Sequence, residues 1–342
     1  FELPSDRAYS ETCAAIGSVM LGWRLLLATG REDHADQIER ALFNVVATAP
    51  DAAGTSFFYV NPLQRNVPGV PALPDEPSPR AASSQRAPWF EVSCCPTNTA
   101  RTLASLAGYV ASTDETGIRI HQYAPAEITT TLRDGAPVRL RVTTEYPLDG
   151  RIAVEVLEAP AREWTLTLRI PGWARGAAVI DAPRGAELGE GVVTARGRFA
   201  AGDVVRLTLP VEPRFTFPDP RIDAIRGSVA VEAGPLVYCL ESVDAPEGID
   251  LARVAVRPDA ALVREGDLVR TTVRIGGGAD AAWAYAPTEP AQTGPAAEVA
   301  LIPYHRWAER GPSTMRVWLP VQPASAVRPG STTTPEGEEA HP

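Results

Sequence analysis

The stretch "LASLAGYVASTDETGIRIHQY", Leu103–Tyr123, decides the fold because the hydrophobic period changes within it. Apolar Leu103, Leu106 and Val110 recur at three- and four-residue spacing, which is typical of one face of a helix. The turn-rich segment "STDETG" follows, and from Ile118 onward apolar and polar residues alternate, which indicates a β-strand. We therefore expect a helical part before this stretch and a β-rich part after it.

Three helices are predicted in the first part, residues 1–117. The first begins at Ser10, which can cap it, and ends at Gly30. The second covers residues 32–47, and the third begins at Pro96, because proline suits the first turn of a helix. The segment between the last two helices, residues 61–88, is rich in proline and serine, and loops of that length are often functional.

The rest of the chain reads as short strands separated by Gly, Pro and Asp turns, a pattern typical of β-sandwiches. We predict an α+β multidomain fold with one β-sandwich at 118–214, a second at 215–322 and a disordered, apolar-poor tail at 323–342. The predicted strands are "IRIHQY", "VRLRVTTEY", "RIAVEVLEA", "WTLTLRI", "VVRLTL", "SVAVEA", "LVYCLE" and "MRVWL".

Composition excludes some classes of function. The 342 residues are 44% hydrophobic and 22% charged, as in soluble globular proteins. The net charge of −10 argues against nucleic acid as a partner, because phosphate binding favours a basic surface. No run approaches the ~18–20 apolar residues that span a bilayer, so no membrane association is expected.

Three of the four cysteines lie in two short motifs, "SETCAAIG" (Ser10–Gly17) and "EVSCCPTNTA" (Glu91–Ala100). Cys94 and Cys95 are adjacent and directly precede Pro96, at the N-terminus of the third predicted helix. The helix dipole and the free backbone N–H groups there favour thiolate, the form that binds metal and attacks carbon.

Three interpretations of these cysteines stay open. They can be inert buried thiols, as Cys239 is expected to be within the strand "LVYCLE". Cys13 can form a disulfide with one of the pair, whereas adjacent cysteines rarely bridge each other. Alternatively Glu11, Cys13, Cys94 and Cys95 form a tetrahedral site suited to Zn²⁺, although E-x-C…C-C is not a standard zinc motif. In that case Glu11 must lie at or before the first helical turn, because residues two apart on a helix point in different directions.

Several motifs in order resemble the bacterial β-L-arabinofuranosidases of glycoside hydrolase family 127. They are "YSETCAAIG", "FFYVNPL", "CCPTNTAR", "RIPGWA", "RGSVAVEAGPLVYCLE" and "IPYHRWAERGPSTMRVWL". The resemblance runs from Phe1 to about Leu319.

The resemblance implies that residues 1–117 are the C-terminal part of an (α/α)6 barrel, followed by the two β-sandwiches. It implies a retaining exo-glycosidase that releases terminal β-L-arabinofuranose, or a related sugar, from an oligosaccharide or glycoconjugate. Cys94 would be a nucleophile bound to Zn²⁺, with Glu11, Cys13 and Cys95 completing the metal site. Tyr59, in "FFYVNPL", would contact the sugar.

By the same resemblance the general acid/base glutamate falls before Phe1, along with the first half of the barrel. We therefore expect these residues alone to be inactive and to leave apolar helix surface unburied. Glu2 and Asp6 do not substitute for the acid/base. Glu91 is expected to be a loop carboxylate, and His121 a residue on a strand surface.

A second class of function is a non-catalytic glycan-binding or structural protein with a structural Zn²⁺ site. The expected location is the cytoplasm, because zinc-bound thiolates survive better under reducing conditions. A homodimer stays open as the assembly.

Overall fold

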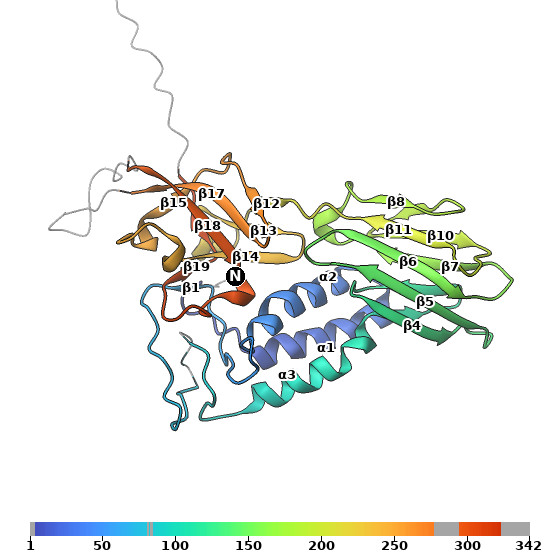
Figure 1. Cartoon of the computed structure of the whole chain (residues 1–342), viewed down its shortest axis with the longest axis horizontal. Coiled ribbons are helices and arrows are strands. Elements are labelled where there is room, and N and C mark those ends of the chain that lie inside the picture. Colours follow the sequence, from blue (N-terminus) through green and yellow to red (C-terminus); the bar gives the residue numbers. More distant parts are fainter. Residues whose placement is uncertain (1–3, 81, 83–84, 277–293, 323–342) are drawn as a thin grey trace, which may run out of the picture.

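The computed structural model describes residues 4–80, 82, 85–276 and 294–322. Three helices lie below two β-rich parts (Figure 1). One is built from residues after 110, and the other from residues after 212 together with one short strand at residues 64–65. The mixed α+β class predicted from the change of period is confirmed. Glu2 and the tail at 323–342, which was predicted to be disordered, lie outside the described residues.

All three predicted helices are present, with shifted starts. Glu11, and not Ser10, is the residue that precedes the first turn, and the Ser10 carbonyl instead accepts a bond from the Asn61 backbone N–H at 2.8 Å. The third helix begins at Cys94, two residues before Pro96. The helices are α1 (Thr12–Thr29), α2 (Asp33–Arg40), continued by a π-helical segment (Ala41–Val46), and α3 (Cys94–Ser105), followed by a 3₁₀ turn (Leu106–Tyr109).

Helix α1 packs closely against α2 through a small residue. Gly22 is buried, and a Cβ at that position would lie 3.1 Å from Cγ1 of Ile38. Gly30 ends α1 in the left-handed conformation, with φ 68°, and its N–H donates to the Leu26 carbonyl at 2.8 Å. The predicted stop at Gly30 is therefore confirmed.

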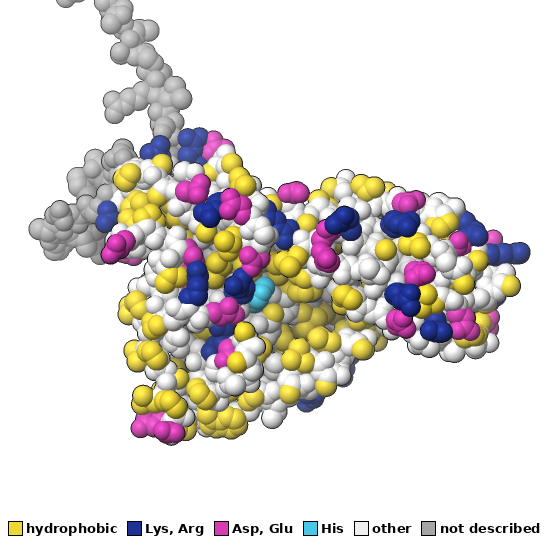
Figure 2. Space-filling model, viewed as in Figure 1, with side chains coloured by type: hydrophobic (Ala, Val, Ile, Leu, Met, Phe, Trp, Pro, Cys, Tyr) yellow, Lys and Arg dark blue, Asp and Glu magenta, His cyan; other side chains and the backbone are white. Residues whose placement is uncertain are grey.

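The other face of α1 is exposed and apolar. Leu21 and Leu27 are 57% and 55% exposed, and Leu103 on α3 is 54% exposed. Among the described helices, α1 is long and apolar enough to cross a membrane by length and composition alone, with a mean hydropathy of 1.4. Arg24 interrupts its apolar sequence, so the expectation drawn from uninterrupted apolar runs did not include it. Figure 2 shows hydrophobic side chains gathered where the helical part meets the neighbouring β-rich part.

The first β-rich part consists of two five-stranded sheets that share one apolar core. Strand β5 is representative, because its side chains alternate strictly between exposed and buried. Trp164 and Leu166 from one sheet and Val154 and Val156 from the other belong to the same buried cluster. The strand order in the first sheet is β2 (Ala111–Thr113), β3 (Gly117–Ile120), β7 (Trp164–Arg169), β10 (Val192–Gly197) and β9 (Glu187–Gly189). The order in the second sheet is β4 (Ala126–Thr131), β5 (Pro137–Thr144), β6 (Arg151–Glu158), β11 (Val204–Thr208) and β8 (Val179–Asp181).

The second β-rich part is, over the residues that the structure describes, one hydrogen-bonded network of ten strands with apolar clusters on both faces. In β14, Tyr238 and Leu240 belong to one cluster and Cys239 to the other, so this strand is buried on both sides. "MRVWL", predicted as one strand, forms two short ones. The strands are β1 (Gln64–Arg65), β12 (Pro213–Thr216), β13 (Ser228–Ala233), β14 (Leu236–Glu241), β15 (Val254–Val256), β16 (Val263–Glu265), β17 (Leu268–Ile275), β18 (Ala296–Pro303), β19 (Met315–Arg316) and β20 (Leu319–Pro320).

The predicted irregular segment 61–88 is bound to the second β-rich part by a strand pair and a side-chain hydrogen bond. Its only strand among the described residues, β1, pairs antiparallel with β19, with Gln64 opposite Arg316. Tyr304 donates from its hydroxyl to the Pro62 carbonyl at 2.7 Å, and Phe58 stacks on Trp307 with ring centroids 4.9 Å apart. These contacts hold the chain that carries Tyr59.

A buried ion network, which we call the arginine joint, connects α2 to the first β-rich part. Arg169 is fully buried and pairs with Asp36 at 2.5 Å and with Glu39. Glu39 also accepts bonds from the Tyr146 hydroxyl at 2.5 Å and the Trp173 indole N–H at 3.1 Å. Every charged group of the joint therefore has a partner of opposite sign within the protein.

The prediction that His121 lies on a strand surface is wrong. His121 is only 2% exposed, because α1 and α2 cover this face of β3. Its ring meets Trp23 edge-on, 5.5 Å between centroids, and lies 2.8 Å from the Ser112 hydroxyl and 3.7 Å from the Glu32 carboxylate. The alternating pattern does not show that a helix covers the second face of a strand.

Candidate metal centre

Four side chains that are distant in sequence meet at the N-termini of α1 and α3. One carboxylate oxygen of Glu11 and the sulfur atoms of Cys13, Cys94 and Cys95 all lie within 4.8 Å of one another. Such a set of donors could hold a metal ion. These four residues formed one of the three interpretations left open by the sequence, and the resemblance favoured it over the other two.

The start of α1 is fixed by the strand-like segment around Tyr59. Glu11 forms an isolated antiparallel bridge with Val60, and the Thr12 N–H donates to the Tyr59 carbonyl at 3.1 Å. The Thr12 hydroxyl donates to the Phe58 carbonyl at 2.9 Å and accepts from the Asn61 side chain at 3.0 Å. Because Glu11 immediately precedes the first turn, it can face the same point as Cys13, as the metal interpretation requires.

The start of α3 separates the two adjacent cysteines. Cys95 is 0% exposed and packs in the apolar cluster that contains Phe57, Tyr59 and Phe90. Cys94 is exposed. Consecutive side chains on a helix point about 100° apart, so one thiol faces the core and the other faces solvent.

The distances within the cluster are short. The Cys94 sulfur lies 3.3 Å from the Tyr59 hydroxyl oxygen and 3.5 Å from Oε1 of Glu11. The Cys95 sulfur lies 3.6 Å from that of Cys13 and 3.9 Å from that of Cys94. All four cysteines are free thiols, so the disulfide interpretation is wrong.

Burial keeps the two inner thiols protonated when no cation is bound. Burial and the Cys13 thiol beside it raise the pKa of Cys95 well above its usual range. Burial also raises the pKa of Cys13, although a hydrogen bond from Asn98 opposes this shift. The bond with Cys94, together with burial, raises the pKa of Tyr59. The thiolate that the helix dipole was expected to favour is thus disfavoured at Cys95 without a metal ion, and burial has the same effect at Cys13.

Two neighbours of the cluster were not predicted. Asn98 donates from Nδ2 to the Cys13 sulfur at 2.9 Å. Tyr9, half exposed, hydrogen-bonds through its hydroxyl to Glu11, and the Arg80 guanidinium lies over its ring at 5.9 Å. Asn98 lies one helical turn after Cys94, and this spacing could have revealed it. Glu91 is exposed and accepts from the Arg80 N–H at 3.3 Å, outside the donor set, as expected of a loop carboxylate.

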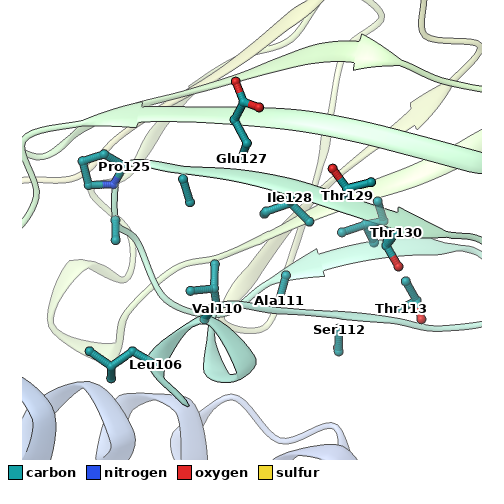
Figure 3. Close-up of a pocket in the computed structure, with 14 residues that line it drawn as sticks. Leu106, Val110, Ala111, Ser112, Thr113, Pro125, Glu127, Ile128, Thr129 and Thr130 are labelled. Atoms are coloured by element: carbon teal, nitrogen blue, oxygen red, sulfur yellow. The ribbon is translucent and has the colours of Figure 1, made fainter. Parts of the chain in front are cut away.

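A surface hollow of about 620 Å³ lies at the C-terminal end of α3. Figure 3 shows Leu106 at its foot, Val110 and Ala111 along one side, and Ile128 and Thr130 of β4 across from them. Helix α3 places this hollow roughly 18 Å from Cys94, since a helix rises 1.5 Å per residue. It contains none of the four donor residues, so it is separate from the candidate metal centre.

Three family models match the chain in order. Residues 1–108 match the catalytic domain of β-L-arabinofuranosidases of glycoside hydrolase family 127, residues 117–211 the middle domain, and residues 213–320 the C-terminal domain of that family. The chain belongs to glycoside hydrolase family 127. This membership confirms the resemblance inferred from the motifs.

Individual relatives of the family 127 chain agree with this. It is 31% identical over 336 residues to a non-reducing end β-L-arabinofuranosidase of Bifidobacterium longum, covering 93% of the chain and 50% of the relative. A family 127 β-L-arabinofuranosidase structure from Geobacillus stearothermophilus T6 is 34% identical, with a TM-score of 0.80 over 94% of the chain and 51% of the relative. A further glycoside hydrolase structure gives 29% identity and a TM-score of 0.82, covering 94% of the chain and 53% of the relative. The chain thus spans about half the length of the relatives it matches.

Proposed function

We propose that this family 127 chain carries the nucleophile and the metal site of a retaining exo-glycoside hydrolase. The substrate would be a terminal β-L-arabinofuranoside, or a related sugar, on an oligosaccharide or glycoconjugate. The observation that carries the proposal is the convergence of one carboxylate and three thiols within 4.8 Å, in a chain that belongs to a glycosidase family.

The donor set fits Zn²⁺. In a tetrahedral site with zinc–sulfur bonds of 2.3 Å, neighbouring sulfur atoms are ~3.8 Å apart. The two short sulfur–sulfur distances around Cys95 are 3.6 and 3.9 Å. Bound Zn²⁺ would supply positive charge that keeps the thiols deprotonated near neutral pH, against the effect of burial.

Each residue then has a distinct task. Cys94, the exposed thiol, attacks the anomeric carbon as its bond to the aglycone oxygen breaks, and the sulfur later leaves when water attacks the same carbon. Cys13, Cys95 and Glu11 hold the metal ion beside it. Tyr59, 3.3 Å from the Cys94 sulfur, is placed to orient either the sulfur or a sugar hydroxyl.

Hydrolysis also needs a group that protonates the leaving oxygen and then deprotonates water. From the family resemblance, we propose that this group is a glutamate outside the 342 residues. We therefore propose that the 342 residues turn over unactivated glycosides only when the acid/base is supplied. A reducing compartment such as the cytoplasm suits the three thiols of the site.

A structural zinc site in a glycan-binding protein is the second candidate. It is favoured by the presence of four protein donors, because structural sites use all four positions whereas catalytic sites usually keep one open. The exposure of Cys94 separates the two functions, because a structural ligand needs no access to substrate.

An activated substrate tests the proposal on this chain. A 2,4-dinitrophenyl β-L-arabinofuranoside has a leaving group that needs no proton, so Cys94 can displace it without the general acid. We expect the zinc-loaded chain to release one burst of dinitrophenolate and to gain one pentosyl group on Cys94, found by peptide mass spectrometry. Cys239→Ala should react as the parent chain does, and Cys94→Ser should not react. A folded, zinc-loaded chain that gains no sugar would refute Cys94 as the nucleophile and would favour the structural zinc site.

A further inference from the structure

Asn98 lies on α3 directly against the metal centre. Its Nδ2 atom donates to the Cys13 sulfur at 2.9 Å, and its backbone carbonyl accepts from the Thr102 hydroxyl at 2.8 Å. Cys13 comes from α1, so this bond joins the N-terminal turns of the two helices that carry the site.

The orientation of the Asn98 carboxamide is fixed by Arg101. The Arg101 guanidinium donates to Oδ1 of Asn98. Because a guanidinium can only donate, the atom that faces it must be the amide oxygen, and the amide nitrogen must then face Cys13. Among the described residues, Arg101 has no carboxylate partner, and its guanidinium bonds instead to the Asn98 side chain.

The three sulfur atoms therefore differ in their surroundings. Cys13 receives an N–H bond from Asn98, Cys95 is fully buried among apolar side chains, and Cys94 is exposed. A hydrogen bond to a thiolate stabilises the charge on sulfur and lowers its reactivity toward carbon.

We propose that Asn98, oriented by Arg101, is a positioning residue that holds the Cys13 sulfur in place as a ligand of the metal. This proposal depends on the metal centre of the proposed function. It also predicts that three thiols on one metal ion would differ in reactivity: Cys13 is held by the amide, Cys95 is enclosed, and Cys94 is exposed.

Cobalt binding by the purified chain tests this without substrate. Co²⁺ bound to thiolates gives sulfur-to-metal charge-transfer absorption whose energy reports the charge on sulfur. Second-sphere partners of metal ligands typically change affinity by about 10- to 100-fold, so we expect Asn98→Ala to weaken Co²⁺ binding by at least roughly tenfold. The charge-transfer band should move to lower energy. Arg101→Ala, which frees the carboxamide to turn, should produce a smaller change in the same direction.

Ser105→Ala is the matched control, because Ser105 lies on the same helix and bonds only to α3 carbonyls. It should leave both affinity and band unchanged. Asn98→Ala with unchanged affinity and band, in a chain with native circular dichroism, would overturn the proposal, as would a parent chain that binds no cobalt through sulfur. A parent chain with the thiolate band but no reaction with the dinitrophenyl substrate would instead refute the proposed function alone.

Discussion

The candidate metal centre and the arginine joint both connect distant parts of the chain through acidic side chains, but only the joint contains its own cation. In the joint, Asp36 and Glu39 surround the buried guanidinium of Arg169. At the metal centre, Glu11 and three thiols meet with no guanidinium among their described contacts. The joint is thus complete as folded, whereas the candidate metal centre would gain its full anionic form with a cation from solution.

The largest effect should come from removing the cation of the joint. Arg169→Met leaves Glu39 buried without its positive partner, which typically costs about 3–5 kcal/mol of unfolding free energy. Urea denaturation would measure this loss. The control is Arg196→Met, because the Arg196 side chain is 75% exposed and its Nε atom lies as far as 3.8 Å from the Glu163 carboxylate. A loss no larger than that of the control would show that the joint does not hold the helical part in place.

At the metal centre the cation should act as a ligand that stabilises the fold. Zinc at 100 times its dissociation constant should raise the free energy of unfolding by about 2.7 kcal/mol. Thermal melts with and without zinc would show the shift. Cys239→Ala, which removes a thiol outside the centre, should keep the zinc response, whereas Cys95→Ser should reduce it. An equal response in Cys95→Ser would place zinc elsewhere.

The two adjacent cysteines should differ in reactivity. In the metal-free chain, iodoacetamide should modify exposed Cys94 on the order of tenfold faster than buried Cys95, because alkylation requires access as well as thiolate. Zinc should protect both. Peptide mass spectrometry over time gives the two rates, and equal rates would mean that α3 does not begin as described.

The smallest effect concerns a carboxylate that is satisfied by neutral donors alone. Burial by itself raises the pKa of Asp51, but bonds from Ser56 and Thr55 lower it to about 2. Since the pKa of Asp51 is depressed in the folded chain, its contribution to stability is complete above the ordinary carboxyl pKa and is lost as pH falls from about 4 to about 2. Asp51→Asn should flatten stability over that window. An identical pH profile in the variant would contradict this assignment.

Much of the fold follows from local pattern. The alternation in "VRLRVTTEY" and the start and stop signals at Ser10 and Gly30 predicted a strand and a helix that the structure contains. Burial of His121 could not be predicted, because a single strand pattern does not show which helix covers it. The shift of the helix start from Ser10 to Glu11 depends on the bridge to Val60, a contact between segments about fifty residues apart.

The site was predicted less by physics than by resemblance. Nothing in the spacing of Glu11, Cys13, Cys94 and Cys95 shows that they meet, since their convergence depends on how α1 and α3 pack. The position of Asn98 one turn after Cys94 was the available signal for it, but its bond to Cys13 depends on how α1 and α3 pack. The roles of Cys94 and Tyr59 in catalysis remain predictions.

X-ray absorption at the zinc edge of the purified, zinc-loaded chain tests the central claim most directly. The structure predicts about three sulfur atoms at ~2.3 Å and about one oxygen at ~2.0–2.2 Å, with one sulfur lost in Cys95→Ser. A zinc shell of nitrogen and oxygen alone, or a folded chain that binds no zinc, would contradict the assignment of Glu11, Cys13, Cys94 and Cys95 as one metal centre.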